Sequence, residues 1–249
     1  MALLFTTPAW AGETVQYRDG DLVLEGYFAP SQCGTEKAPV VLVVHQWMGL
    51  GDYEKSRADM LAEKCYNAFA VDMYGQGIRP TTKAAAGAQS GIYKNNPAIA
   101  RGRMNAALDY VRRRTDVDPT RVAAIGYCFG GTMALELARS GAPLDAAISF
   151  HGGLGSKAPV TQAGAIKAAI QVHHGADDPH VPEAEVEAFI NEMNTAGADW
   201  VFTSYADAVH AFTEKGAGND PASGAAYNAK ADRRSWDATL DFLGENLAP

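Results

Sequence analysis

Short apolar runs alternate along the chain with longer segments in which apolar residues recur every three or four positions. The short runs are rich in Val, Ile, Tyr and Phe, which is typical of β-strands, and the longer segments have the period of amphipathic helices. This pattern predicts strands at 14–18, 21–29, 40–45, 67–72, 121–126, 146–150, 168–174 and 200–205. It predicts helices at 53–64, 98–115, 130–140, 183–197 and 226–246.

The order of these elements indicates an α/β fold. Asp19-Gly20 is a hairpin turn signal between the first two strands, and the remaining strands alternate with helices. The run VVLVVH at 40–45 is apolar throughout, as expected of a parallel strand covered on both faces. We therefore expect a mostly parallel eight-stranded sheet with helices on both faces, in one domain over residues 12–249. The stretch 75–97 has the least regular pattern and is interpreted as a loop or lid.

Composition narrows the class of partner. The chain has 249 residues, of which 47% are hydrophobic and 20% charged, and its formal net charge is −8. This acidic balance argues against nucleic acid or an anionic membrane surface as a partner. No segment has the roughly 20 consecutive apolar residues of a membrane span. The sequence favours a small-molecule partner and is compatible with a monomer or a small homo-oligomer.

The N-terminus and the cysteines bear on the compartment. Residues 1–11 are mostly apolar and end in Ala9-Trp10-Ala11, an A-x-A pattern typical of a signal-peptide cleavage site. We expect a signal-peptide remnant and a periplasmic or secreted protein; the alternative is an apolar N-terminal arm on a cytoplasmic protein. In an exported chain, Cys33 and Cys65 are the natural disulfide and Cys128 stays free. Two unpaired thiols are the other possibility.

Cys128 lies in a motif that suggests chemistry. Gly126-Tyr127-Cys128-Phe129-Gly130 is G-x-C-x-G, which has the form of the G-x-S-x-G nucleophile elbow of α/β-hydrolases with sulfur in place of oxygen. A buried strand precedes it and a helix follows, so the helix N-terminus favours a thiolate. The simpler alternative is a buried cysteine that acts as a small hydrophobic residue.

A nucleophile of this kind needs a base and an acid that orients the base. In α/β-hydrolases the acid and then the histidine follow the nucleophile along the chain. Asp178 follows the strand at 168–174 and His210 follows the strand at 200–205, so both lie at the rim where parallel strands end. We interpret Asp178 as the acid and His210 as the base. Asp177 is the alternative acid and is more typical of a turn or cap.

The other histidines have weaker assignments. His45 and His173 end strands and are interpreted as structural, with His174 beside them. His151 lies at the rim and His180 is a candidate for the pocket wall. The histidine and cysteine spacings match no metal site, and no dinucleotide or P-loop motif is present, so we expect neither metal nor cofactor.

Five motifs in this order resemble the dienelactone hydrolase family: HQWMGL, AVDMYGQG, GYCFGG, GADDPHVP and VHAF. The resemblance spans roughly residues 13–247. It implies an α/β-hydrolase fold, a triad of Cys128, Asp178 and His210, and hydrolysis of cyclic enol esters, or more broadly of lactones and small esters. It also implies that the backbone N–H groups of Trp47 and Phe129 form the oxyanion hole.

The sequence departs from the archetypal family pattern in three places. The archetype has Gln-Glu where this chain has His45-Gln46, and its glutamate holds the resting thiol. The arginines that bind a substrate carboxylate are replaced by Gln76 and Glu214. The hydrolase class is therefore a firmer prediction than a carboxylated dienelactone as substrate.

The prediction is a two-step acyl transfer through a thioester on Cys128. A general carboxylesterase or acyltransferase is the alternative within enzymes; a binding protein with a hydrolase fold or a redox thiol is the alternative outside them. We expect the substrate pocket to be lined by Gln46, Tyr74, His151, His180 and Phe212.

Overall fold

A computed structural model describes residues 12–34 and 37–248 of the chain. The expected signal-peptide remnant, residues 1–11, lies outside the described residues. None of the described helices combines the length and apolar character needed to cross a membrane.

Eight strands form one sheet in the order β1-β2-β4-β3-β5-β6-β7-β8. The β1–β2 and β2–β4 pairs are antiparallel, and every other neighbouring pair is parallel. Asp19 pairs with Leu22 across the predicted hairpin turn, where Gly20 has a φ of 58°. The strands are β1 (Glu13–Asp19), β2 (Leu22–Ala29), β3 (Ala38–Val44), β4 (Asn67–Val71), β5 (Val117–Tyr127), β6 (Ala146–Phe150), β7 (Ala169–Gly175) and β8 (Trp200–Tyr205).

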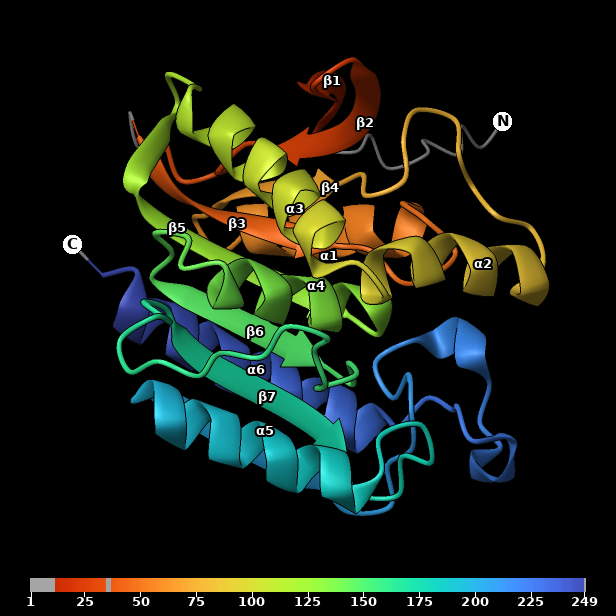
Figure 1. Ribbon diagram of the computed structural model, residues 1–249. Coiled ribbons are helices and arrows are strands. Elements are labelled where there is room, and N and C mark those ends of the chain that lie inside the picture. The colour runs from red at the N-terminus through yellow and green to blue at the C-terminus, as the bar shows by residue number, and fades with distance from the viewer. Residues whose placement is uncertain (1–11, 35–36, 249) are drawn as a thin grey trace, which may run out of the picture.

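Helices cover both faces of this sheet (Figure 1), as the apolar strands predict. On one face lie α3 (Pro97–Arg112), α4 (Phe129–Arg139) and α5 (Glu183–Ala196); on the other lie α1 (Asp52–Ala62) and α6 (Ala229–Asn246). Strand β3 shows how one segment serves both layers. Val40, Leu42 and Val44 pack with the first group of helices, while Val41 and Val43 pack with the second.

Residues 75–97 are more regular than the sequence suggested. They contain a helix, α2 (Lys83–Lys94), whose N-cap Thr82 accepts a hydrogen bond from the N–H of Ala85. The helix buries only Ala86, Ser90 and Tyr93, and Gly87 and Gly91, which disfavour a helix, gave the segment the composition of a loop. The prediction of a loop was wrong for these twelve residues. The segment before α6 adds two short 3₁₀ turns, η1 (Lys215–Ala217) and η2 (Pro221–Ser223).

Cys33 and Cys65 form a disulfide, with their Cα atoms 5.1 Å apart, and Cys128 is a free thiol. The bond ties the loop after β2 to the turn that follows α1. Of the two arrangements left open by the sequence, the structure has the disulfide.

Candidate active site

The predicted nucleophile elbow is present between β5 and α4. Cys128 has a φ of 55° and a ψ of −115°, the strained backbone of a sharp strand-to-helix turn. The flanking glycines are required by space. A Cβ atom on Gly126 would lie 2.0 Å from the carbonyl oxygen of Gly130, and a Cβ atom on Gly130 would lie 2.2 Å from the carbonyl oxygen of Val44.

Cys128 is half-buried at the N-terminus of α4. The His210 imidazole and the N–H of Phe129 both act on its sulfur and lower the pKa of the thiol. Its own N–H donates to the carbonyl of Phe150 at 3.0 Å and to Nδ1 of His151 at 3.2 Å. The turn that carries the thiol therefore meets polar donors and imidazole groups in addition to the core against which Cys128 packs.

Asp178 and His210 lie together at the carboxyl ends of β7 and β8. His210 Nδ1 is 2.8 Å from Asp178 Oδ2, and the Asp178 side chain is fully buried. The other carboxylate oxygen accepts the N–H of His180 at 2.8 Å. Asp177 is exposed and makes no such contact with His210. The structure thus brings the hydrogen-bonded His210–Asp178 pair to the same cavity as Cys128, where His210 acts on the thiol.

Electrostatics favours the ionised form of this chain. Burial alone lowers the pKa of His210, but the Asp178 hydrogen bond and the Cys128 sulfur outweigh it and raise that pKa to about 10. Burial raises the pKa of Cys128, yet the hydrogen bond and charge of His210, the Phe129 N–H and the Lys94 ammonium together lower it below the ordinary thiol value. The two pKa shifts therefore favour the thiolate form of Cys128 and the imidazolium form of His210.

A cavity of about 1000 Å³ opens beside the sulfur. Its walls come from the loop after β3, the start of α1, helix α2, the elbow, and the long segment that carries His210. In Figure 1, α2 and this segment both extend past the end of the sheet toward which β6 and β7 point. The lining includes Gln46, Trp47, Met48, Tyr53, Glu54, Lys83, Ser90, Lys94, Cys128, Phe129, Thr132, His180, Val181, His210 and Glu214.

Gln46 lies on the cavity wall, and its side-chain NH₂ group, its backbone N–H and its backbone carbonyl each have a protein partner. Its side-chain amide donates to Glu214 Oε2 at 2.9 Å, and its N–H donates to Glu54 Oε1 at 3.1 Å. Its carbonyl accepts a hydrogen bond from His45 Nδ1. Two of the three positions that depart from the family archetype, 46 and 214, therefore contact each other across 168 residues of sequence.

Three predicted pocket residues do not line the cavity. Tyr74, His151 and Phe212 are at most 2% exposed and lie behind the wall. The Tyr74 hydroxyl donates to the carbonyl of Trp47 at 2.9 Å, and His151 stacks edge-on against Phe212. Their positions next to rim motifs predicted the region correctly but not the direction of their side chains, so these three predictions were wrong. His180 does line the cavity.

The two residues predicted to form an oxyanion hole both border the cavity. Within the described residues, the Trp47 N–H has no protein hydrogen-bond partner, whereas the Trp47 carbonyl is fixed by Tyr74. The Phe129 N–H opens the first turn of α4 beside the sulfur. Both N–H groups therefore lie next to the cavity without a partner in the sheet or helix.

Two other histidines have structural surroundings. His45 is buried, accepts the N–H of Met73 at Nε2, and has its pKa lowered to about 4 by burial. His173 is hydrogen-bonded to Tyr205 and Thr239, and burial lowers its pKa to about 3. Among the residues that the structure describes, no group of three or more His, Cys, Asp or Glu side chains is arranged to hold a metal ion.

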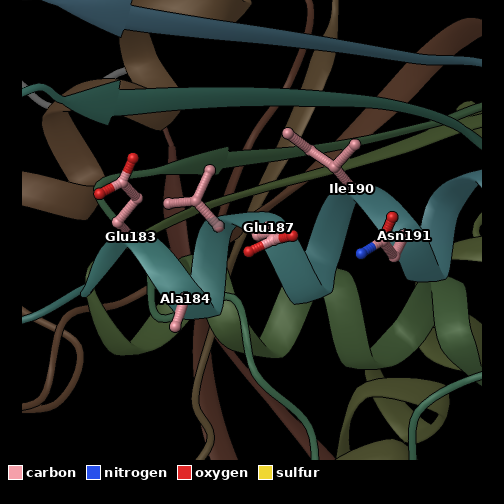
Figure 2. A pocket seen from close by; sticks show the side chains of 6 residues that line it. Glu183, Ala184, Glu187, Ile190 and Asn191 are labelled. Carbon is pink, nitrogen blue, oxygen red and sulfur yellow. The ribbon is translucent and has the colours of Figure 1, made fainter.

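A second hollow, of about 490 Å³, lies along α5. Figure 2 shows it lined by side chains of that helix alone, among them Glu183, Glu187 and Ile190. It shares no lining residue with the cavity at Cys128, and no cysteine, serine or histidine lines it. Of the two cavities, the one at the strand ends is therefore the candidate active site, because it contains Cys128 and His210.

The fold and the site define the class of protein: an α/β-hydrolase, with an elbow, an acid and a histidine in the order that this fold uses. The model of the dienelactone hydrolase family matches residues 24–247. The chain therefore belongs to the dienelactone hydrolase family and is a hydrolase that acts on ester bonds.

Individual relatives agree with this assignment. The crystal structure titled as a dienelactone hydrolase-like promiscuous phosphotriesterase, P91, from metagenomic libraries is 38% identical, with a TM-score of 0.88 over 95% of this chain and 98% of that chain. The uncharacterized protein K02A2.1 of Caenorhabditis elegans is 40% identical over 59% of this chain and 93% of its own. A Bradyrhizobium protein named "Probable 2-oxo-3-(5-oxofuran-2-ylidene)propanoate lactonase" is 25% identical over 86% of each chain.

Proposed function

We propose that Cys128 is the nucleophile of this hydrolase and that it cleaves lactones and small esters through an acyl-thioester intermediate. The observation that carries the proposal is that Cys128, at the strained turn, lies on one cavity with His210, which lowers its pKa and is hydrogen-bonded to the buried Asp178. A nucleophile, a base and an orienting carboxylate in contact are the arrangement that activates a weak nucleophile.

The first half-reaction forms the thioester. The Cys128 thiolate attacks the carbonyl carbon, and the carbonyl oxygen becomes an oxyanion held by the N–H groups of Trp47 and Phe129. The tetrahedral intermediate collapses, the bond from carbon to the ester oxygen breaks, and the leaving alkoxide or enolate takes the proton from His210. Asp178 holds the His210 ring in place and stabilises its charge.

The second half-reaction regenerates the thiolate. Neutral His210 takes a proton from water, and the resulting hydroxide attacks the thioester carbonyl through the same oxyanion hole. Collapse breaks the carbon–sulfur bond and releases the carboxylic acid, leaving the thiolate beside the imidazolium. The cycle needs no metal or cofactor to balance.

The resting state of the thiol differs from that of the family archetype. Gln46 is neutral, and its amide donates to Glu214 instead of to the sulfur. The partner left to Cys128 is His210, which supports a resting thiolate–imidazolium pair. We expect the nucleophile to be ionised before substrate arrives.

For the substrate we favour an uncharged or weakly charged lactone or small ester. Glu214 occupies the place of an archetypal arginine and lines the cavity, which disfavours a carboxylate at that position. The lactonase and phosphotriesterase names of the relatives suggest compounds to test beside simple esters. A general carboxylesterase is the second candidate because the cavity of about 1000 Å³ is wide.

We also propose that the protein is exported and that residues 1–11 are the C-terminal part of a signal peptide. The Cys33–Cys65 disulfide supports this, since such bonds persist in oxidising compartments. The intact mass of the protein recovered from a periplasmic fraction tests it. Cleavage after Ala11 is the expected result, and a full-length chain confined to the cytoplasm contradicts export.

The decisive experiment compares wild type with Cys128→Ala on a p-nitrophenyl acetate, lactone and phosphotriester panel, with intact-mass analysis of quenched reactions. Wild type should hydrolyse the ester or lactone and carry a transient acyl mass. Cys128→Ala should lose both while keeping the wild-type melting temperature. Equal hydrolysis by both proteins without an adduct would refute the cysteine mechanism and favour the binding-protein alternative for this cavity.

A further inference from the structure

His151 is buried directly behind the nucleophile and has no part in the reaction steps above. Its side chain is hydrogen-bonded at both nitrogens: Nδ1 lies 3.2 Å from the N–H of Cys128, and Nε2 lies 2.8 Å from Oγ1 of Thr213. His151 has a φ of 40°, a conformation that a residue of this type rarely adopts. Strained backbone conformations of this kind cluster at functional sites, where the surrounding structure holds them in place.

The Cys128 end of this chain fixes the direction of the two hydrogen bonds that His151 makes. The Cys128 N–H can only donate, so His151 Nδ1 accepts and Nε2 carries the proton. Nε2–H then donates to the Thr213 hydroxyl, which shares a hydrogen bond of 2.7 Å with the Tyr53 hydroxyl. At the far end the Arg57 Nε–H also donates to the Tyr53 hydroxyl, at 3.2 Å.

This chain links separate elements of the fold. His151 follows β6, Thr213 lies three residues after His210, and Tyr53 and Arg57 belong to α1. Arg57 is anchored in turn by Asp232 of α6, at 2.6 Å. The turn that carries the sulfur and the loop that carries the base are therefore joined through one imidazole and one hydroxyl.

We propose that His151, acting through Thr213, is a positioning residue that holds the nucleophile turn and the His210 loop at the separation needed for the Cys128–His210 contact. The inference rests on the proposed role of Cys128. No other side-chain hydrogen bond in the described residues joins the Cys128 backbone to the base loop.

The expected size of the effect follows from how catalysis depends on geometry. A displacement of about 1 Å between reacting groups costs about a hundredfold in rate. If the His151–Thr213 contact is lost, the Cys128 N–H keeps the Phe150 carbonyl, so the elbow persists but is less firmly held. We expect kcat to fall by about tenfold to a hundredfold, with KM within about twofold because neither residue lines the cavity.

Thr213→Val tests this directly, since it removes the hydroxyl and keeps the shape of the side chain. Thr213→Ser restores the hydroxyl. Thr239→Val is the matched control: Thr239 is equally buried and its hydroxyl lies 3.0 Å from Nε2 of another histidine, His173, outside the cavity. The measurements are kcat and KM on the ester, the rate of iodoacetamide labelling at Cys128 near pH 6, and the melting temperature.

The proposal expects Thr213→Val to lower both kcat and the labelling rate, Thr213→Ser to recover most of each, and Thr239→Val to lower only the melting temperature. It is overturned if Thr213→Val and Thr239→Val have the same kcat, or if Thr213→Ser is as impaired as Thr213→Val. Labelling needs no ester turnover, so it tests the positioning even if Cys128→Ala still hydrolyses esters and the proposed function fails.

His151→Asn is the second variant if Thr213→Val does not fold. Asparagine tolerates a positive φ and its side-chain oxygen can accept the Cys128 N–H, but it is too short to reach Thr213. The same losses in kcat and labelling rate are expected. A wild-type kcat in His151→Asn would overturn the proposal.

Discussion

Replacing Asp178 by asparagine removes one charge from the buried chain at Cys128 and changes almost nothing else in size. The carboxylate lies 2.8 Å from Nδ1 of His210 and is fully buried. An asparagine in the same place offers either an amide N–H or an oxygen to that nitrogen. If the amide donates, the proton of His210 moves to Nε2, where it faces the sulfur and the ring cannot accept a proton.

The expected fall in kcat has two causes, the loss of the Asp178 charge and the change of the His210 tautomer. Two unit charges about 4 Å apart attract by about 4 kcal/mol at an effective dielectric constant of about 20. This is about a thousandfold in the stability of the imidazolium that the reaction requires, at 1.36 kcal/mol for each factor of ten. The same substitution in the chymotrypsin triad, where the tautomer also changes, lowers kcat by about 10⁴. We expect Asp178→Asn to lower kcat by about 10³ to 10⁴.

The assay is steady-state hydrolysis of a p-nitrophenyl ester, with active-site titration to count folded enzyme. KM should stay within about threefold, because Asp178 does not line the cavity. Asp177→Asn is the matched control, since that carboxylate is exposed and does not contact His210. A loss of less than tenfold in Asp178→Asn, or an equal loss in Asp177→Asn, would refute the assignment of the acid.

Iodoacetamide should label Cys128 rapidly near pH 6. Because the pKa of Cys128 is lowered, the labelling rate should fall only as the pH drops through that lowered pKa. A labelling rate no faster than that of free cysteine, whose pKa is about 8.5, would contradict the Cys128–His210 ion pair. Replacing both Cys33 and Cys65 by serine should lower the free energy of unfolding by about 3 kcal/mol in urea titrations and leave kcat unchanged, since the bond closes a separation of 32 residues away from the cavity. Gly126→Ala should destabilise the fold by about 3 kcal/mol, which is the upper end for overpacking. Gly244→Ala is the control: its Cβ would meet nothing within 4 Å, so it should stabilise the fold by up to about 1 kcal/mol. Equal melting temperatures of the two variants would contradict the steric account of the elbow.

The strands and five of the six helices could be predicted from the sequence because each buries an apolar face whose period is visible in the residues. Helix α2 was missed although its apolar residues recur with a helical period, because Gly87 and Gly91 and the threonines before it are typical of a loop. The local evidence for a helix was the Thr82 cap followed by a run of alanines.

The acid and the base were predictable as rim residues because the fold sends the ends of parallel strands to one edge. The pocket was less predictable, since residues at this edge point either into the cavity or into the layer behind it. The backbone of His151 has a positive φ, and no sequence pattern predicts this conformation or the burial of the side chain. The Gln46–Glu214 contact joins positions 168 residues apart and follows from the tertiary structure alone.

Helix α2 differs from the other walls of the cavity in how little the core depends on it. The remaining walls follow strand ends whose side chains are packed on both faces, whereas α2 contributes Lys83, Ser90 and Lys94 to the lining and buries three residues. Tyr93 belongs to the core and Lys94 lowers the pKa of Cys128, so both should be kept in any library. Libraries at the other positions of this helix should change substrate preference at small cost in folding, because the core and the turnover residues lie elsewhere.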